Sequence, residues 1–489
     1  MEVFLKASKM AGVRFSRLST VRQGKGAAMR SLKFVAMAVF GVSMMTSPLM
    51  AQQGGNQGGN QNGGNGGQFP GGILINPGGV VDQSVVPAGG SAGLRKQLKS
   101  AAAQMLTTEL NQSTEIRYVS LKRLEQELQN KLSAGKPLPP EMRFLAGLTR
   151  IDYVMVAEGG QDAVFAGPAE GFAPTGSGRV VGVESGRPVL CLDDLLVAFR
   201  SAAGENAVGC SIDPDPQRLA TAQQWLRQNS SAAVPNVARA RLERMVSLQG
   251  AWNITTFGVP EESRMCLAMI EADYLMKRLA IGIDHHGIKG MKNSLSMAAP
   301  GDNMLRRWWF APDYTVMQRN EEGTIYRMGG PRFQLFAQEE VLDANGNRAD
   351  ADFSQPSSEK FAKSFNERRE ELVRRIPAFA DLQNIFDVLT AVAILQYRQS
   401  EGVLHWAPDV FLDADILPVQ SYASAKETAP VLNVRMSGTS LIIGAFTGGV
   451  TLQPQRLSRE FTELESDELK QQLHVTETKA GHQNRWWWD

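Results

Sequence analysis

The stretch after Pro377 constrains the fold most, because AFADLQNIFDVLTAVAIL (378–395) is apolar on nearly every side of a helix. A helix with apolar side chains all round is stable in water only when other elements cover it on every side. The sequence therefore predicts a long buried helix over these residues. The rest of the chain must supply the layers that surround it.

Those layers are predicted to mix helices and strands. Helical spacing extends from residue 94 to residue 132, and strand-like runs follow between residues 152 and 213, with a helix beginning at Asp193. From 306 to 352, alternating runs are separated by NEEG, GGP and DANGN, which are hairpin signals. Three closing strands are expected, at 430–436, 439–446 and 449–453.

The predicted fold class is α+β, with mixed helices and short strands in the N-terminal part and antiparallel hairpins in the C-terminal part. We expect the globular region to span 94–455, as one or two packed units. The polar stretch NSSAAVPN suggests an internal boundary near 229–250. The remaining tail, 456–489, is charged and ends in RWWWD.

The first 51 residues have the pattern of a secretory signal peptide. They contain eight Lys or Arg and one acid, Glu2, followed by an apolar run from Phe34 to Met45. That run is shorter than the ~18–20 residues of a membrane-spanning helix, so we expect cleavage after Ala51 and no transmembrane helix in the mature chain. Met29 is an alternative start. The predicted location is periplasmic or extracellular.

Removal of this segment makes the chain mildly acidic, since 43 bases then face 49 acids. Such a surface lacks the basic footprint of a nucleic-acid-binding protein. Residues 52–93 hold 15 of the 47 glycines and many Asn and Gln, a low-complexity composition with little apolar surface to bury. We expect them to form a flexible linker.

The three cysteines fit an oxidising compartment only in part. One disulfide is possible, and Cys191–Cys210 is the favoured pair because each residue lies beside an expected strand end. The alternative is three buried free thiols.

The stretch EADYLMKRLAIGIDHHGIKG (271–290) holds the candidate catalytic residues. We expect a helix from Pro260 to just before Gly282, with Asp273 and Lys277 paired on the side opposite the core stripe. Adjacent histidines rarely bind one metal together, and no third ligand follows at helical spacing. We favour the interpretation that these charged residues serve helix geometry and solvation over the interpretation that they form an active site. The weak catalytic candidates are Glu271, Asp273, Asp284, His285 and His286.

Clustered tryptophans are the binding candidates. RRWWF places two tryptophans beside two arginines, and the chain closes with three more between Arg485 and Asp489. A Trp side chain combines a large apolar area with one donor, which suits an interface anchor or a sugar-stacking platform. We expect the terminal triplet to dock, on this protein or on a partner. The candidates are Arg307, Trp308, Trp309, Trp486, Trp487 and Trp488.

Several stretches together resemble a family of exported planctomycete-type proteins with a domain of unknown function. The likeness covers about 143–450 and implies export and one extended α+β domain. It implies no known activity, cofactor or catalytic residues. The stretches are AGPAEGF, GRPVLCLDDLLVAFR, CSIDPDP, GVPEESRMCLAMIEADYLMKRLAIG, RRWWFAPDY and PAFADLQNIFDVLTAVAIL.

No complete motif for a metal, nucleotide or other cofactor is present, so none is expected. We predict an exported, non-enzymatic protein that binds a protein or glycan of the envelope or matrix through aromatic surfaces. The alternative is an exported hydrolase of peptide or glycan that uses the acids around 271–286. A third possibility is that the protein is a structural scaffold that binds no ligand.

Overall fold

The computed structural model describes residues 73–75, 80–83 and 92–489, the last range with gaps. The expected signal peptide, 1–51, lies outside the described residues, as does most of the expected linker and charged tail. The gaps are 177, 202–206, 230–234, 300–301, 303–304, 314–316, 331, 343–347, 351–354, 438–439, 454–461 and 464–484.

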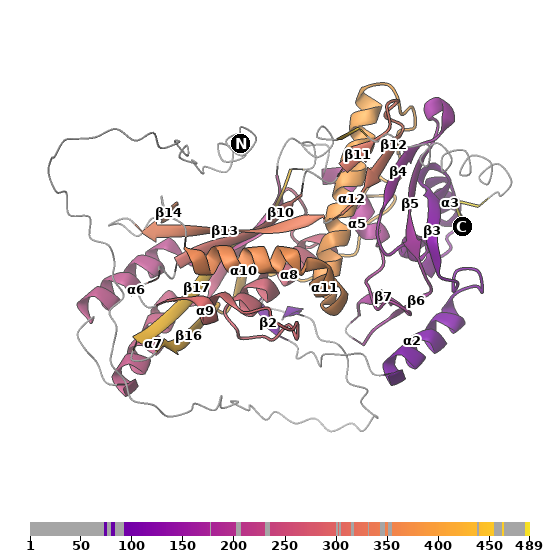
Figure 1. Ribbon diagram of the computed structural model, residues 1–489. Helices are drawn as coiled ribbons and strands as arrows, with labels where there is room; N and C mark the ends of the chain where they lie inside the picture. The colour runs from indigo at the N-terminus through magenta and orange to yellow at the C-terminus, as the bar shows by residue number, and fades with distance from the viewer. Residues whose placement is uncertain are drawn as a thin grey trace.

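The structure is α+β, as predicted, and is built on two large mixed sheets (Figure 1). The larger sheet has ten strands, and two of its pairings, β10 with β17 and β2 with β15, are parallel. Its order is β1 (Ile73–Ile75), β2 (Val80–Gln83), β15 (Glu427–Thr428), β9 (Trp252–Phe257), β8 (Val208–Asp213), β17 (Ser440–Leu452), β10 (Leu305–Pro312), β13 (Phe333–Leu342) and β14 (Arg348–Asp350), with β16 (Leu432–Ser437) also on β17.

The second sheet has seven strands drawn from both ends of the chain. A separate hairpin, β6 (Phe172–Pro174) with β7 (Val180–Gly182), follows its strand β5. The order of the sheet is β18 (Thr462–Glu463), β11 (Met317–Arg319), β12 (Ile325–Met328), β4 (Tyr153–Val156), β5 (Ala163–Ala169), β3 (Thr114–Ser120) and β19 (Trp487–Trp488).

Helix α12 (Pro377–Ser400) stands between the two sheets and is buried, which confirms the prediction for 378–395 (Figure 1). It packs on α5 (Leu192–Ser201), α8 (Arg264–Ala280), α11 (Arg369–Arg375) and β4. Among the described residues, it is the one helix long and apolar enough to cross a membrane, and its most apolar window is wholly buried in the protein.

Helix α8 lies against strands β8, β10 and β17 of the larger sheet and against α5 and α12. Its predicted stop is confirmed, because Gly282 follows the cap with φ of +72°. Its start lies later than Pro260, since Ser263 is the N-cap and accepts from the Cys266 amide. The other helices are α2 (Ala92–Met105), α3 (Leu121–Ser133), α4 (Pro140–Arg143), α6 (Pro216–Gln228), α7 (Pro235–Gln249), α9 (Ser294–Met297) and α10 (Pro356–Glu367).

Two of the expected hairpin turns differ from the prediction. The GGP signal at 329–331 does not mark a hairpin, because the strands before and after it, β12 and β13, belong to different sheets. Arg332 fixes this crossing by pairing with Asp387 of α12 and donating to the Gly329 carbonyl. The other hairpins, β11 with β12 and β13 with β14, are formed.

The glycines near residue 448 allow close strand contact instead of a turn, so two expected strands, 439–446 and 449–453, form the single strand β17. A Cβ on Gly448 would lie 2.0 Å from the Trp308 carbonyl oxygen, and one on Gly449 would lie 1.8 Å from that of Cys210. Only glycine lets β10 and β8 approach β17 this closely.

Two expected boundaries also change. Residues 229–250 do not separate units, because α6 and α7 form a helical pair between strands β8 and β9, which are neighbours in one sheet. The expected linker, 52–93, contains β1 and β2, and β2 adds to the larger sheet through β15.

Candidate functional site

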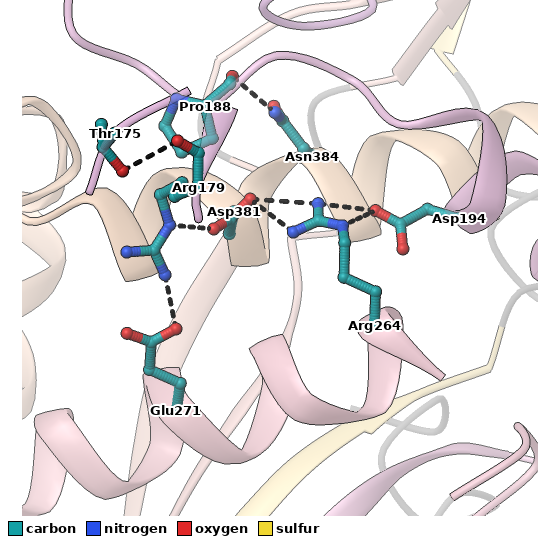
Figure 2. A network of polar contacts seen from close by, with 8 residues as sticks. All are labelled: Thr175, Arg179, Pro188, Asp194, Arg264, Glu271, Asp381 and Asn384. Atoms are coloured by element: carbon teal, nitrogen blue, oxygen red, sulfur yellow. Dashed lines mark hydrogen bonds and ion pairs between the residues drawn. The ribbon is translucent and has the colours of Figure 1, made fainter. Parts of the chain in front are cut away.

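A chain of five charged side chains, three buried carboxylates and two half-buried arginines, connects α5, α8, α12 and the β6–β7 hairpin (Figure 2). Arg179, which precedes β7, bridges Glu271 on α8 at 2.5 Å and Asp381 on α12 at 2.6 Å. Arg264, the first residue of α8, bridges Asp381 at 3.1 Å and Asp194 on α5 at 2.7 Å. Asp381 is thus held by both guanidinium groups.

Nearby polar contacts orient the hairpin over α12. Thr175 Oγ1 donates to the Arg179 carbonyl at 2.8 Å, and the Asn384 side-chain amide donates to the Pro188 carbonyl at 2.9 Å (Figure 2). These bonds fix the backbone on both sides of β7, which places the Arg179 side chain between α8 and α12.

The charges of this network do not balance, because three carboxylates face two guanidinium groups. Asp381 lies between both arginines, and their charges hold its pKa below the usual range despite its burial. Asp194 contacts only Arg264, and burial raises its pKa to about 6. Its Oδ1 atom is buried without a hydrogen-bond partner. Asp194 therefore takes up a proton more readily than Asp381 does.

A second buried pair lies one turn further along α8. Lys277 Nζ is 2.6 Å from Asp273 Oδ2 and 2.8 Å from the Gly448 carbonyl oxygen on β17. Neither side chain has any exposed surface. Burial raises the pKa of Asp273 to about 7. The predicted i,i+4 pair is therefore confirmed, but its expected position away from the core is wrong, because the larger sheet covers that side of α8.

The five catalytic candidates do not form one site. Glu271 and Asp273 belong to the two buried pairings just described. Asp284 binds Arg278 at two points, with distances of 2.7 and 2.9 Å. Asp284, His285 and His286 line a surface pocket just after α8. Within the described ranges, no group of three or more His, Cys, Asp or Glu side chains lies close enough together to hold a metal ion.

The tryptophan candidates divide between the two sheets and share no groove. Trp308 on β10 is fully buried and packs on Phe361 with 4.7 Å between the ring centres. Trp309, on the opposite face of the same strand, is half-buried and stacks on Phe336 at 5.8 Å. Arg307 is half-buried on the same face as Trp309.

The terminal triplet docks on this protein, which was one of the two expected outcomes. Trp486, Trp487 and Trp488 are 6, 8 and 3% exposed. Trp487 and Trp488 form β19, which pairs with β3, and Trp488 stacks on Tyr118 with 5.6 Å between ring centres. Their expected role as a binding surface is therefore wrong, because packing against β3 covers them.

The expected disulfide between Cys191 and Cys210 is not formed, and all three cysteines are buried free thiols. The charged groups around Cys191 are Asp193, Asp194 and Arg264, whereas Cys210 on β8 lies near Asp273, Lys277 and Cys266. The two thiols thus belong to different surroundings. Burial raises the pKa of each, which keeps them protonated.

Sequence reasoning missed Arg179, Arg264, Asp194 and Asp381. A signal was present in the central helix, where DLQNIFD places polar residues at 381, 384 and 387 within an otherwise apolar surface. Charged residues are almost never fully buried unless they are paired. Their presence in a buried helix therefore implied cationic partners from other elements.

Comparison with known protein families gives a match over part of the chain. Residues 210–293 match the model of a family described as "Protein of unknown function (DUF1598)". The match spans β8, α6, α7, β9, α8 and the loop after α8. No curated protein matches the chain, and no solved structure does. The chain thus contains a DUF1598 domain of unknown function at residues 210–293.

Proposed function

We propose that the protein is an exported, non-enzymatic binding component of the cell envelope or extracellular matrix. The observation that carries this proposal is the pairing of the chemically capable side chains with one another in the interior. Glu271 and Asp273 are each neutralised by a cation, from the β6–β7 hairpin and from α8 itself. Pairs of this kind connect elements of the fold and leave neither of these two acids open to a substrate.

A hydrolase using these acids is less well supported. Such an enzyme needs two carboxyl groups that face one substrate with pKa values pushed apart. Asp194 and Asp381 do differ in this way, but they are 2 and 1% exposed and contact the same arginine. A substrate could reach them only if α5, α8 and α12 separated.

The half-exposed face of the larger sheet is the surface that we assign to binding. Its centre is Trp309, which stacks on Phe336. Two residues before Trp309 on β10, Arg307 lies opposite Gln338 of β13. All four side chains are half-buried. An indole beside amide and guanidinium donors suits a sugar ring, which stacks its apolar face and accepts hydrogen bonds at its edge. We therefore propose a glycan as the ligand of this face.

Export can be tested by mass spectrometry of the N-terminus of the protein recovered from its native cells. Cleavage after Ala51 and recovery outside the cytoplasm are expected. Recovery of an uncleaved chain from the cytoplasm would contradict export.

Glycan binding can be tested by co-sedimentation of the purified chain with isolated envelopes. Trp309→Ala should lower the bound fraction at least fivefold, while Trp225→Ala, which removes a half-buried tryptophan on α6, should leave it within twofold. Binding should survive protease treatment of the envelopes and be lost after periodate oxidation of their sugars. The reverse pattern would identify a protein partner and overturn the glycan assignment.

A further inference from the structure

A pocket of about 370 Å³ lies just beyond the C-terminal end of α8, between the 281–293 loop and α9. Its volume is near the lower end of the ~300–1,000 Å³ typical of small-molecule sites. The pocket falls almost wholly within the family match and is separate from the buried network. Its polar lining consists of Asp284, His285, His286, Lys292, Asn293 and Ser296.

The fixed hydrogen bonds of the lining leave donors available to a ligand. The Ile288 amide donates to His286 Nδ1 at 3.0 Å, so the proton of the neutral imidazole is on Nε2, which can donate. The Asn293 side-chain oxygen accepts from the Ser296 amide at 2.7 Å as the N-cap of α9. The NH₂ group of Asn293 therefore remains a donor.

The charges around the pocket leave a positive surplus. Asp284 is neutralised by Arg278, and Glu371 pairs with Arg375 at 3.0 Å. Among the residues that the structure describes, no carboxylate pairs with Lys292 or with Lys289 or Arg368. Lys292 lines the pocket, and Arg368 lies next to the loop at Gly290. This surplus favours a negatively charged ligand.

The end of α8 would oppose an anion if its last carbonyl groups were free. Those of Lys277, Arg278 and Leu279 are already bonded within the protein. The amides of Ile281, Gly282 and Ile283 donate to the carbonyls of Lys277, Leu279 and Arg278, respectively. The Asn433 side chain donates to the Ile281 carbonyl at 2.7 Å. These bonds offset the negative end of the helix dipole.

We propose that this pocket binds a tetrahedral oxyanion, a phosphate or sulfate group, carried by a small molecule of about sugar size. Lys292 supplies the charge, and the His286 Nε2–H, the Asn293 NH₂ and the exposed His285 imidazole supply directed hydrogen bonds. An oxyanion accepts several such bonds at once, and each is charge-assisted and therefore stronger than the bond that an uncharged oxygen would accept. The site is separate from the Trp309 face and does not require export.

Binding should strengthen as pH falls. Partial burial, His285, Arg368 and Arg375 lower the pKa of His286, and Glu371 opposes them. A bound dianion adds negative charge beside the ring and favours its protonated form. By linkage, the ligand must then bind more tightly to the protonated pocket. The other charged groups that line the pocket are Lys292, which pairs with no carboxylate among the described residues, and Asp284, which is paired with Arg278.

The test is isothermal titration of the full chain at constant ionic strength, with sodium chloride as the balancing salt. The probes are sodium sulfate, sodium phosphate, glucose 6-sulfate, glucose 6-phosphate and glucose. The four anions should bind and glucose should not. Tighter binding of the sugar esters than of the free ions would identify a sugar-borne group, and equal binding would identify the free ion as the ligand. Sulfate keeps its charge across the range, so its affinity should rise at least threefold from pH 8 to pH 5.5.

Matched variants separate a pocket from general surface charge. Lys292→Met should weaken sulfate binding at least tenfold, whereas Lys289→Met, an exposed lysine three residues away that does not line the pocket, should change it less than twofold. Both side chains are exposed, so both variants should keep the thermal midpoint of the parent. Binding of glucose alone, no binding of any anion, or equal losses in the two variants would each overturn the proposal.

Discussion

The Arg117 guanidinium and the Asp489 carboxylate form a two-point ion pair, with Nε–Oδ1 and Nη2–Oδ2 distances of 2.6 and 2.9 Å. Arg117 on β3 is fully buried, donates to the Ala146 carbonyl and lies over the Trp487 ring. The charged residues on both sides of the tryptophan triplet thus serve to hold it: Asp489 at one end, and Arg485, which pairs with Glu109, at the other.

Asp489→Asn should lower the free energy of unfolding by about 1–3 kcal/mol. Removing one partner of a fully buried pair costs roughly 3–5 kcal/mol, and the partial exposure of Asp489 reduces that figure. Urea denaturation measures the change. Arg485→Ala removes an exposed pair and should cost less than about 0.5 kcal/mol. Equal losses in the two variants would contradict a specific role for the buried guanidinium.

The contribution of Asp194 to stability should fall as pH rises from about 4 to 6. Its pKa is raised to about 6 in the folded protein, above the ordinary value of 3.8, so the folded state binds the proton more tightly. That contribution is complete below pH 4 and is lost as pH rises through 6. The lowered pKa of Asp381 acts in the opposite direction, but only below pH 4.

Asp194→Asn isolates this effect, because it leaves two carboxylates facing two guanidinium groups. The free energy of unfolding of the variant should rise relative to that of its parent as pH increases from 4 to 8. Chemical denaturation at four pH values gives this difference, in which the shared titration of other groups cancels. A difference that stays constant with pH would show that folding does not shift the pKa of Asp194.

The central helix and the fold class could be predicted because their signals are local. An apolar surface on every side of 378–395 requires burial whatever the partners are, and alternating runs with turn residues indicate hairpins. The position of Gly282 likewise marks the end of α8. None of these inferences needed to know which elements meet in space.

The candidate site depended on contacts between distant residues, and there the predictions failed. Of the core stripe expected on α8, Ala268, Ala272 and Leu279 are buried, but the fourth member, Leu275, is half-buried. The sequence does not indicate that a sheet covers the other side of the helix, so Lys277 is expected in solvent. The terminal tryptophans pair with β3, more than 360 residues earlier in the chain. Pairing with a strand so distant in the sequence leaves no local pattern. The sequence alone therefore does not distinguish a terminal segment docked on its own protein from one that is exposed to partners.

Removing one partner of the Asp273–Lys277 pair on α8 should lower the free energy of unfolding strongly, whereas replacing both partners with apolar side chains should lower it much less. Lys277→Met alone leaves the Asp273 carboxyl group buried without its cation and should destabilise the protein by roughly 3 kcal/mol or more at pH 8. Lys277→Met combined with Asp273→Leu should recover most of that loss, since apolar side chains of similar volume suit the same site. Urea denaturation of the two variants decides this. A double variant no more stable than Lys277→Met would contradict this expectation.

Gly448→Ala should be among the most damaging single substitutions in the larger sheet. The residue has φ of +104°, and an added Cβ would lie 2.0 Å from the Trp308 carbonyl oxygen. Backbone strain of ~1–2 kcal/mol and the displacement of β10 from β17 together should cost roughly 3–5 kcal/mol. Gly135→Ala is the matched control, because Gly135 also has a positive φ, +62°, but no atom lies within 4 Å of the added Cβ. Its cost should be the strain alone, ~1–2 kcal/mol. Thermal and urea unfolding of both variants measure the difference, and equal costs would mean that the close approach of the two strands does not require a glycine.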